Sequence, residues 1–230
     1  MMQYIELILF PIIYVMRVLL ELFYSLSGSY GVSIVLLSVV VSFATLPLAR
    51  YGKTIQDKEE AIQRQMRPQI QAAKQELKGE EQFLRIEAIY KEHNYHPIHS
   101  LKSAAGLLPQ IPFLLAALFL LWDYAPLAGQ GFLFVHDLGL ADALIALGGS
   151  ENATTINLLP FLMSGISLTE VFLGRGSDAG AKLRLSIISV VLLVLVYQLP
   201  AAVLVYWTSN NLISLARALA SNRSAQNDAS

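Results

Sequence analysis

The sequence predicts an all-α protein that crosses a membrane several times, and three observations support this fold class. Of its 230 residues, 55% are hydrophobic and 14% are charged, whereas soluble domains typically carry about 25% charged residues. Four long stretches contain no Asp, Glu, Lys or Arg: residues 22–49, 103–122, 152–169 and 185–216. Because one crossing needs roughly 20 apolar residues, we predict a five-span core, an outer interfacial amphipathic helix and a cytoplasmic helical hairpin.

Residues 1–28 are predicted to form the interfacial helix and residues 29–50 the first span. On a helical wheel the polar side chains of the first segment share one narrow arc, formed by Gln3, Glu6, Arg17 and Glu21. Such a helix lies in the membrane surface, although a sixth span remains an alternative. An organellar transit peptide would be rich in Arg and poor in acids, so this start favours a bacterial plasma (inner) membrane.

Residues 51–102 form the one long polar region and are predicted to fold as a helical hairpin. Its first helix has an apolar stripe at helical spacing, made of Ile55, Ile62, Met66, Ile70, Ala73 and Leu77. The inner face of its second helix is expected to carry Phe83, Ile86, Ile89 and Tyr90. The hairpin is either a solvated connector or a docking device for a substrate or partner. A metal site at His93, His96 and His99 is disfavoured because Pro97 interrupts the helix that would align them.

The remaining segments follow from charge and length. We predict a second span at 103–123, an outer loop at 124–155, a third span at 156–173 and a cytoplasmic loop at 174–184. Residues 185–216 would be about 48 Å long as one helix, too long for a roughly 30 Å hydrocarbon core. Pro200 therefore divides them into a fourth and a fifth span, followed by a cytoplasmic tail at 217–230. Residues 124–155 hold no Lys or Arg, so they belong outside, and the Lys- and Arg-bearing segments inside.

Polar residues inside the predicted spans are the candidate site. Ser38, Ser42 and Thr45 follow one another at helical spacing and share a face of the first span, and Ser167 and Glu170 share a face of the third. Small polar residues often serve as packing contacts between membrane helices, which is the competing interpretation of the serines. Acidic residues within a span usually face the bundle interior or water. We therefore predict that Glu170 lines a polar groove. The alternative is that its side chain reaches the membrane interface or pairs with Arg175 or Lys182.

Short motifs along the chain resemble the YidC/Oxa/Alb family of membrane protein insertases. They occur in the family's order: Tyr30-Gly31-Val32-Ser33-Ile34, Leu46-Pro47-Leu48, Met66-Arg67-Pro68-Gln69-Ile70, Pro109-Gln110-Ile111-Pro112-Phe113, Asp137-Leu138, Leu159-Pro160 and Leu204-Val205-Tyr206-Trp207 followed by Asn211. The resemblance implies that Gln110, Tyr206 and Asn211 belong to a cytoplasm-facing substrate groove. The family places an arginine in the first span where this chain has Ser42, which leaves the electrostatic capture of acidic substrates without its usual residue.

The resemblance implies an insertase that passes hydrophilic segments of substrates through the groove and releases apolar helices into lipid. Its partners would be newly made membrane proteins, the bilayer and a translocon or other membrane complex. The tail has little basic character, so ribosome docking through it is expected to be weak or absent. A net charge of −1 disfavours nucleic acid, and no motif indicates a catalytic, cofactor or metal site. A scaffold for one membrane complex and, less favoured, a small transporter are the alternatives.

Overall fold

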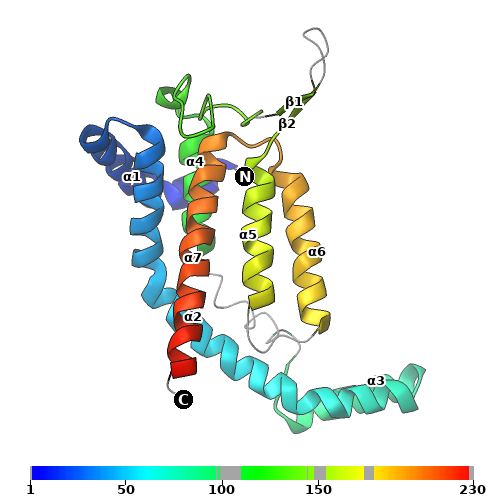
Figure 1. The fold of residues 1–230 in the computed structure, drawn as a ribbon. Coiled ribbons are helices and arrows are strands. Elements are labelled where there is room, and N and C mark those ends of the chain that lie inside the picture. The colour runs from blue at the N-terminus through cyan, green and yellow to red at the C-terminus, as the bar shows by residue number, and fades with distance from the viewer. Residues whose placement is uncertain are drawn as a thin grey trace. The chain divides into compact units, whose positions relative to one another are not determined.

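The structure, a computed structural model, describes residues 2–96, 98, 110–143, 145–147, 154–173 and 179–227. Its elements are α1 (Met2–Ser27), α2 (Tyr30–Glu76), α3 (Gly79–Glu92), α4 (Gln110–Trp122), the 3-10 turn η2 (Ala125–Leu127), β1 (Ile145–Leu147), β2 (Thr154–Ile156), α5 (Leu159–Leu173), α6 (Ala179–Val196) and α7 (Ala201–Asn227) (Figure 1). The predicted helical fold class is confirmed. The two short strands pair antiparallel between α4 and α5, and β2 includes Ile156, which was predicted to begin the third span.

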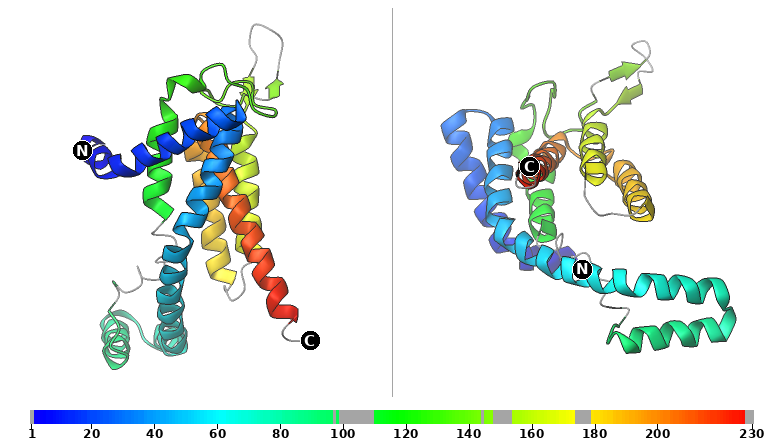
Figure 2. Two further views of the ribbon diagram at one scale, coloured as in Figure 1. Left: turned by 90° about the vertical axis from the view of Figure 1, so that its left-hand side faces the viewer. Right: turned by 60° about the horizontal axis from the view of Figure 1, so that its bottom comes forward.

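The chain divides into two compact units, each with its own core. The bundle unit contains Met1–Phe43 and Phe113–Ser230, and the hairpin unit contains Ala44–Pro112. In the bundle unit, α7 lies between α2 and α5, and α6 packs on the other side of α5 (Figures 1 and 2). The core is built from apolar side chains of these helices, and the most deeply buried include Ile34, Leu37, Leu121, Met163 and Leu204.

Helix α1 runs across the long axes of the other bundle helices (Figure 2, left). It buries Met16 and Leu20 in the bundle core, whereas Phe10 and Tyr14 remain about 60% exposed. Gly28, with φ of +67°, ends α1 and lets the chain reverse into α2. A helix that presents apolar side chains both to the bundle and to its surroundings fits an apolar or interfacial solvent.

The loop from 128 to 143 holds the ends of two helices. The first two N–H groups of α7, those of Ala201 and Ala202, donate to the carbonyls of Leu140 and Leu138 at 2.7 and 2.9 Å. At α5, the buried carboxylate of Asp142 accepts from the N–H groups of Leu158 and Leu159 at 2.5 and 3.1 Å. These contacts satisfy backbone donors that a helix N-terminus leaves unpaired. The helix break therefore combines Pro200 with caps supplied by the loop.

The same loop packs closely against the start of α2. A Cβ atom built on Gly31 would lie 2.0 Å from Cγ of Phe132. This distance is far below van der Waals contact, so only glycine allows the ring to approach the α2 backbone here.

α2 continues without interruption through residue 50 into the charged region. Pro47 and Pro68 lie inside the helix, and the residues after Arg50 are mostly good helix formers. Gly79, with φ of +62°, lies at the reversal into α3. Met66, Ala73 and Ile89 form the buried core between the two helices.

One predicted inner-face residue of α3 is exposed. Phe83 is 66% exposed, so its placement on the inner face was wrong. Gln82 occupies the side that faces the end of α2, where its amide donates to the carbonyls of Leu77 and Lys74 at 2.9 and 3.3 Å. Ile62 on α2 is also 38% exposed, so the buried stripe is shorter than predicted.

By length and composition, two of the described helices could cross a membrane: residues Ile8–Ser27 of α1, and α2. Three shorter apolar helices are found at Gln110–Trp122, Leu159–Thr169 and Ser186–Val196. The outward side of α6 is more than half exposed yet apolar, at Ile187, Ile188, Val191, Val194 and Leu195. A continuous exposed apolar surface is unusual for a protein in water and fits contact with lipid.

Candidate functional site: a polar cluster between α2, α5 and α7

A buried side-chain hydrogen bond joins α2 to α7. The hydroxyl of Ser42 donates to Oδ1 of Asn210 at 2.6 Å, and both residues are about 5% exposed. Asn210 also interacts with the hydroxyl of Tyr206, one turn earlier on α7. Within an apolar bundle a polar side chain must find a partner. The Ser42–Asn210 contact meets that need across two helices.

The next residue of α7 makes an equivalent contact with α5. Nδ2 of Asn211 donates to Oγ of Ser167 at 2.9 Å, and the Ser167 hydroxyl donates to the carbonyl of Met163 at 3.0 Å. Adjacent residues on a helix point about 100° apart. Asn210 and Asn211 therefore connect α7 to two different neighbours at one level of the bundle.

A cation of α7 joins the same arrangement. Nη1 of Arg217 donates to the backbone carbonyl of Ser42 at 3.4 Å. Arg217 lies seven residues, or two helical turns, after Asn210 and therefore shares its face. We call the set Ser38, Ser42, Ser167, Tyr206, Asn210, Asn211 and Arg217 the polar cluster.

The sequence-predicted site residues fall into three groups. Ser38, Ser42, Ser167, Tyr206 and Asn211 all lie in the bundle unit, where Ser38 is fully buried and donates to the carbonyl of Val35 at 2.7 Å. Thr45 is buried and Gln110 is exposed, and both belong to the hairpin unit. Glu170 is part of α5, but its side chain lies outside the described residues.

Sequence reasoning missed Asn210 and Arg217. Asn210 carries a detectable signal, because it lies in the polar run Thr208-Ser209-Asn210-Asn211 inside an otherwise apolar stretch. Arg217 was assigned to the tail by the charge rule, but α7 continues through it to Asn227. Their partner residue, Ser42, lies far away in sequence and could not be identified from spacing.

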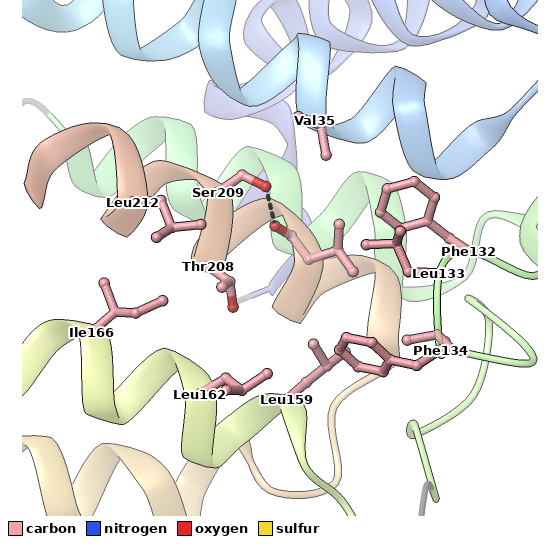
Figure 3. A pocket seen from close by; sticks show the side chains of 12 residues that line it. Val35, Phe132, Leu133, Phe134, Leu159, Leu162, Ile166, Thr208, Ser209 and Leu212 are labelled. Carbon is pink, nitrogen blue, oxygen red and sulfur yellow. Dashed lines mark hydrogen bonds between the residues drawn. The ribbon is translucent and has the colours of Figure 1, made fainter. Parts of the chain in front are cut away.

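An apolar cavity of about 410 Å³ lies beside the polar cluster, between α2, α5, α7 and the loop at 132–135 (Figure 3). Among its lining residues are Val35, Leu162, Ile166 and Leu212, and no predicted groove residue lines it. Ser209 turns its hydroxyl to the carbonyl of Val205 at 2.7 Å. The buried hydroxyl of Thr208 has no hydrogen-bond partner in the described part of the chain.

The cluster is suited to hydrogen bonding. Its described side chains supply hydroxyls, amides and one guanidinium. Within the described residues, no group of three His, Cys, Asp or Glu side chains could hold a metal ion. What the arrangement can do is solvate a hydrophilic group at a place where apolar helices surround it.

Comparisons with known proteins agree with this architecture. A family model described as "60Kd inner membrane protein" matches residues 22–228. Proteins named membrane protein insertase YidC are similar in Treponema denticola (28% identity over 93% of this chain and 38% of that protein) and in Clostridium tetani (26% identity over 86% of this chain and 84% of that protein). The chain spans less than two fifths of the length of its Treponema denticola and Treponema pallidum relatives.

A solved structure shares the fold. The active YidC insertase with its first transmembrane domain resolved superposes with a TM-score of 0.54 at 23% identity, covering 92% of this chain and 45% of that one. The family model covers nearly the whole sequence. The chain therefore belongs to the 60Kd inner membrane protein family, the YidC/Oxa/Alb family of membrane proteins.

Proposed function

We propose that this chain is a membrane protein insertase and chaperone. It passes hydrophilic segments of substrate proteins through a cytoplasm-facing groove and releases their apolar helices into lipid. The observation that carries the proposal is the polar cluster: α7 contributes two amides and a guanidinium to contacts with α2 and α5, among helices whose outer surface is apolar. The names of the relatives support the same activity.

The cluster would act by lowering a barrier. A hydrophilic segment that enters a bilayer loses its hydrogen bonds to water, which costs several kcal/mol for each unsatisfied group. Hydroxyl and amide groups inside the bundle replace some of those bonds.

Release into lipid would follow along the apolar exterior. Once the hydrophilic end has passed, burial of the substrate's apolar helix drives the reaction at about 25 cal/mol per Å². The exposed apolar side of α6 offers a surface along which that helix can slide. This sequence of steps uses neither a nucleotide nor a covalent intermediate.

We place the protein in the bacterial plasma membrane with the helical hairpin and the C-terminal tail in the cytoplasm. Its partners would be newly made membrane proteins, the bilayer and a translocon or another membrane complex. Reporters fused after Ser177 and Ser230 should then report cytoplasm, and a reporter inserted between 128 and 149 should report the outside. A cytoplasmic signal from the 128–149 loop would contradict this topology.

The insertase proposal is tested by reconstituting the full chain in vesicles and measuring protease protection of a substrate protein that has a single membrane span. Such a substrate protein is called the client below. Photoreactive residues at positions 42 and 110 should crosslink to the client during insertion. Ser42→Ala removes one member of the polar cluster and should slow insertion. Ser189→Ala is the matched control, because Ser189 is also a buried serine but lies on α6 outside the cluster.

The main rival is a scaffold for one membrane complex, in which the Ser42–Asn210 bond serves as packing between helices. If the native protein inserts no client above empty vesicles and yields no crosslink, the scaffold interpretation holds. If Ser42→Ala and Ser189→Ala lower stability equally and leave insertion unchanged, the cluster is structural.

A further inference from the structure

Arg217 is a partly buried cation that contacts a neighbouring helix. Its side chain is half-buried, and it reaches from α7 to the Ser42 carbonyl on α2 at 3.4 Å. The same two helices are joined by the Ser42–Asn210 bond. A guanidinium therefore lies next to a buried, neutral polar pair, between two helices, and not on an open surface.

The contacts that the described residues make with Arg217 do not balance its charge. A guanidinium has five N–H donors, and the contact with Ser42 uses a backbone carbonyl, which carries no net charge. Within the described residues Arg217 forms no ion pair with a carboxylate, whereas Arg17, Arg64 and Lys91 each do. The remaining donors are geometrically suited to an oxyanion, because the planar fork of arginine matches a carboxylate.

We propose that Arg217 receives a carboxylate of an acidic client segment as that segment enters between α2 and α7. The inference rests on the proposed insertase function and names the class of substrate that the site favours. Beside Arg217, the Ser42–Asn210 pair offers a hydroxyl and an amide, which suit the mixed donors and acceptors of a polypeptide. A lipid phosphate is an oxyanion as well, so the experiment below includes an anionic lipid to distinguish the two sources.

A simpler role for Arg217 is to fix the orientation of α7, because basic residues collect on the cytoplasmic side of a span. Charge alone serves that role, and lysine would serve it as well. A site for a carboxylate depends on the guanidinium and on its position beside Ser42. Variants that separate charge from geometry therefore decide between the two.

The experiment reconstitutes the full chain in phosphatidylcholine vesicles and compares clients that differ only in an acidic, neutral or basic N-terminal tail. The native protein should insert the acidic client best. Arg217→Gln should slow the acidic client about tenfold, as expected for loss of one charge-assisted contact, and slow the neutral client less. Arg217→Lys should give an intermediate rate. Arg223→Gln, which changes the next arginine of α7, is the matched control and should preserve the acidic preference.

A charge relocation provides the stricter test. The double variant Ser42→Arg/Arg217→Gln moves the guanidinium to the residue that Arg217 contacts, and it should restore the acidic preference that Arg217→Gln loses. Identical tail dependence in native protein and Arg217→Gln would overturn the inference. A change that appears with added phosphatidylglycerol and is the same for every tail would also overturn it, in favour of a lipid site.

Binding of free tail peptides to the detergent-solubilised protein separates the two proposals. The acidic peptide should bind about tenfold more weakly to Arg217→Gln than to the native chain. If no client is inserted by the native protein, the insertase proposal fails, and this affinity difference still decides the role of Arg217. Equal affinities of the acidic peptide for the native chain and for Arg217→Gln would overturn the proposed role of Arg217. If Arg217→Gln does not fold, the same comparison is made with Arg217→Lys.

Discussion

The hydroxyl of Ser42 on α2 donates a buried 2.6 Å hydrogen bond to the side-chain carbonyl oxygen of Asn210 on α7. The two residues are 168 positions apart in the sequence, so this contact forms only when α2 and α7 meet. The same two residues make further polar contacts. Asn210 interacts with the Tyr206 hydroxyl within α7, and the Ser42 carbonyl accepts a hydrogen bond from Arg217.

The strength of this contact can be measured with a double-mutant cycle. Combining Ser42→Ala with Asn210→Ala should reveal a coupling free energy of about 0.6 kcal/mol, and at most about 1.7 kcal/mol, the range found for hydrogen bonds between membrane helices. Thermal unfolding in detergent provides the measurement. Ser38→Ala is the matched control and should show no coupling to Asn210→Ala, because Ser38 donates to the carbonyl of Val35 in its own helix. Comparable coupling for both serines would show that the effect is not the hydrogen bond.

Asp142 should stabilise the start of α5. Its carboxylate accepts from the N–H groups of Leu158 and Leu159, so Asp142→Ala should lower the free energy of unfolding by about 1 to 2 kcal/mol. Asp142→Asn keeps an acceptor and should lose less. Asp137→Ala is a suitable control, since the Asp137 carboxylate bonds Gly139 within the loop and caps no helix. Equal losses for Asp142→Ala and Asp137→Ala would argue against the cap.

Tyr124, in the connection between α4 and η2, should ionise at unusually high pH. Burial, followed by its 2.8 Å hydrogen bond to Glu21, raises its pKa from 10.0 to about 12. Because the folded-state pKa is the higher one, the contribution to stability is complete below pH 10.0 and is lost as the pH rises toward about 12. The difference in ultraviolet absorbance between native protein and Tyr124→Phe, recorded against pH, isolates this residue from the other tyrosines. A transition near 10.0 in that difference would contradict the assignment.

The helical class and the order of the elements could be predicted because they follow from composition and from where the charges lie. The structure ends α6 at Val196 and begins α7 at Ala201, on either side of the proline that the sequence indicated. Periodicity could not show that α2 runs through residue 50, because both sides of that boundary have helical patterns. Nor could it show that Phe83 is exposed, since that depends on where α2 ends.

The candidate site was less predictable for a related physical reason. Spacing places Ser38 and Ser42 on one face, but it cannot say which distant side chain meets them. The identity of Asn210 as the partner depends on the packing of α2 against α7. The prediction ended the fifth span just before Arg217, because a basic residue usually marks the end of a membrane span. A long basic side chain can, however, reach back along its own helix. Thr45 and Gln110, predicted beside these residues, belong to the separate hairpin unit.

Glu170 should influence client choice in the direction opposite to Arg217. This prediction rests on sequence spacing: Glu170 follows Ser167 by three residues on α5, and Ser167 bonds Asn211 within the polar cluster. A carboxylate on that face repels acidic tails and favours basic ones. Glu170→Gln should therefore raise the insertion rate of the acidic client and reduce that of the basic client, whereas Arg217→Gln lowers the acidic rate. Glu170→Asp keeps the charge and should behave like the native protein.

In the double variant Glu170→Gln/Arg217→Gln, additive effects on the logarithm of the rate would indicate two independent charges, and strong non-additivity would indicate that the pair interacts. Tail dependence that is unchanged by Glu170→Gln, with a loss of stability in its place, would assign Glu170 to the structure of α5.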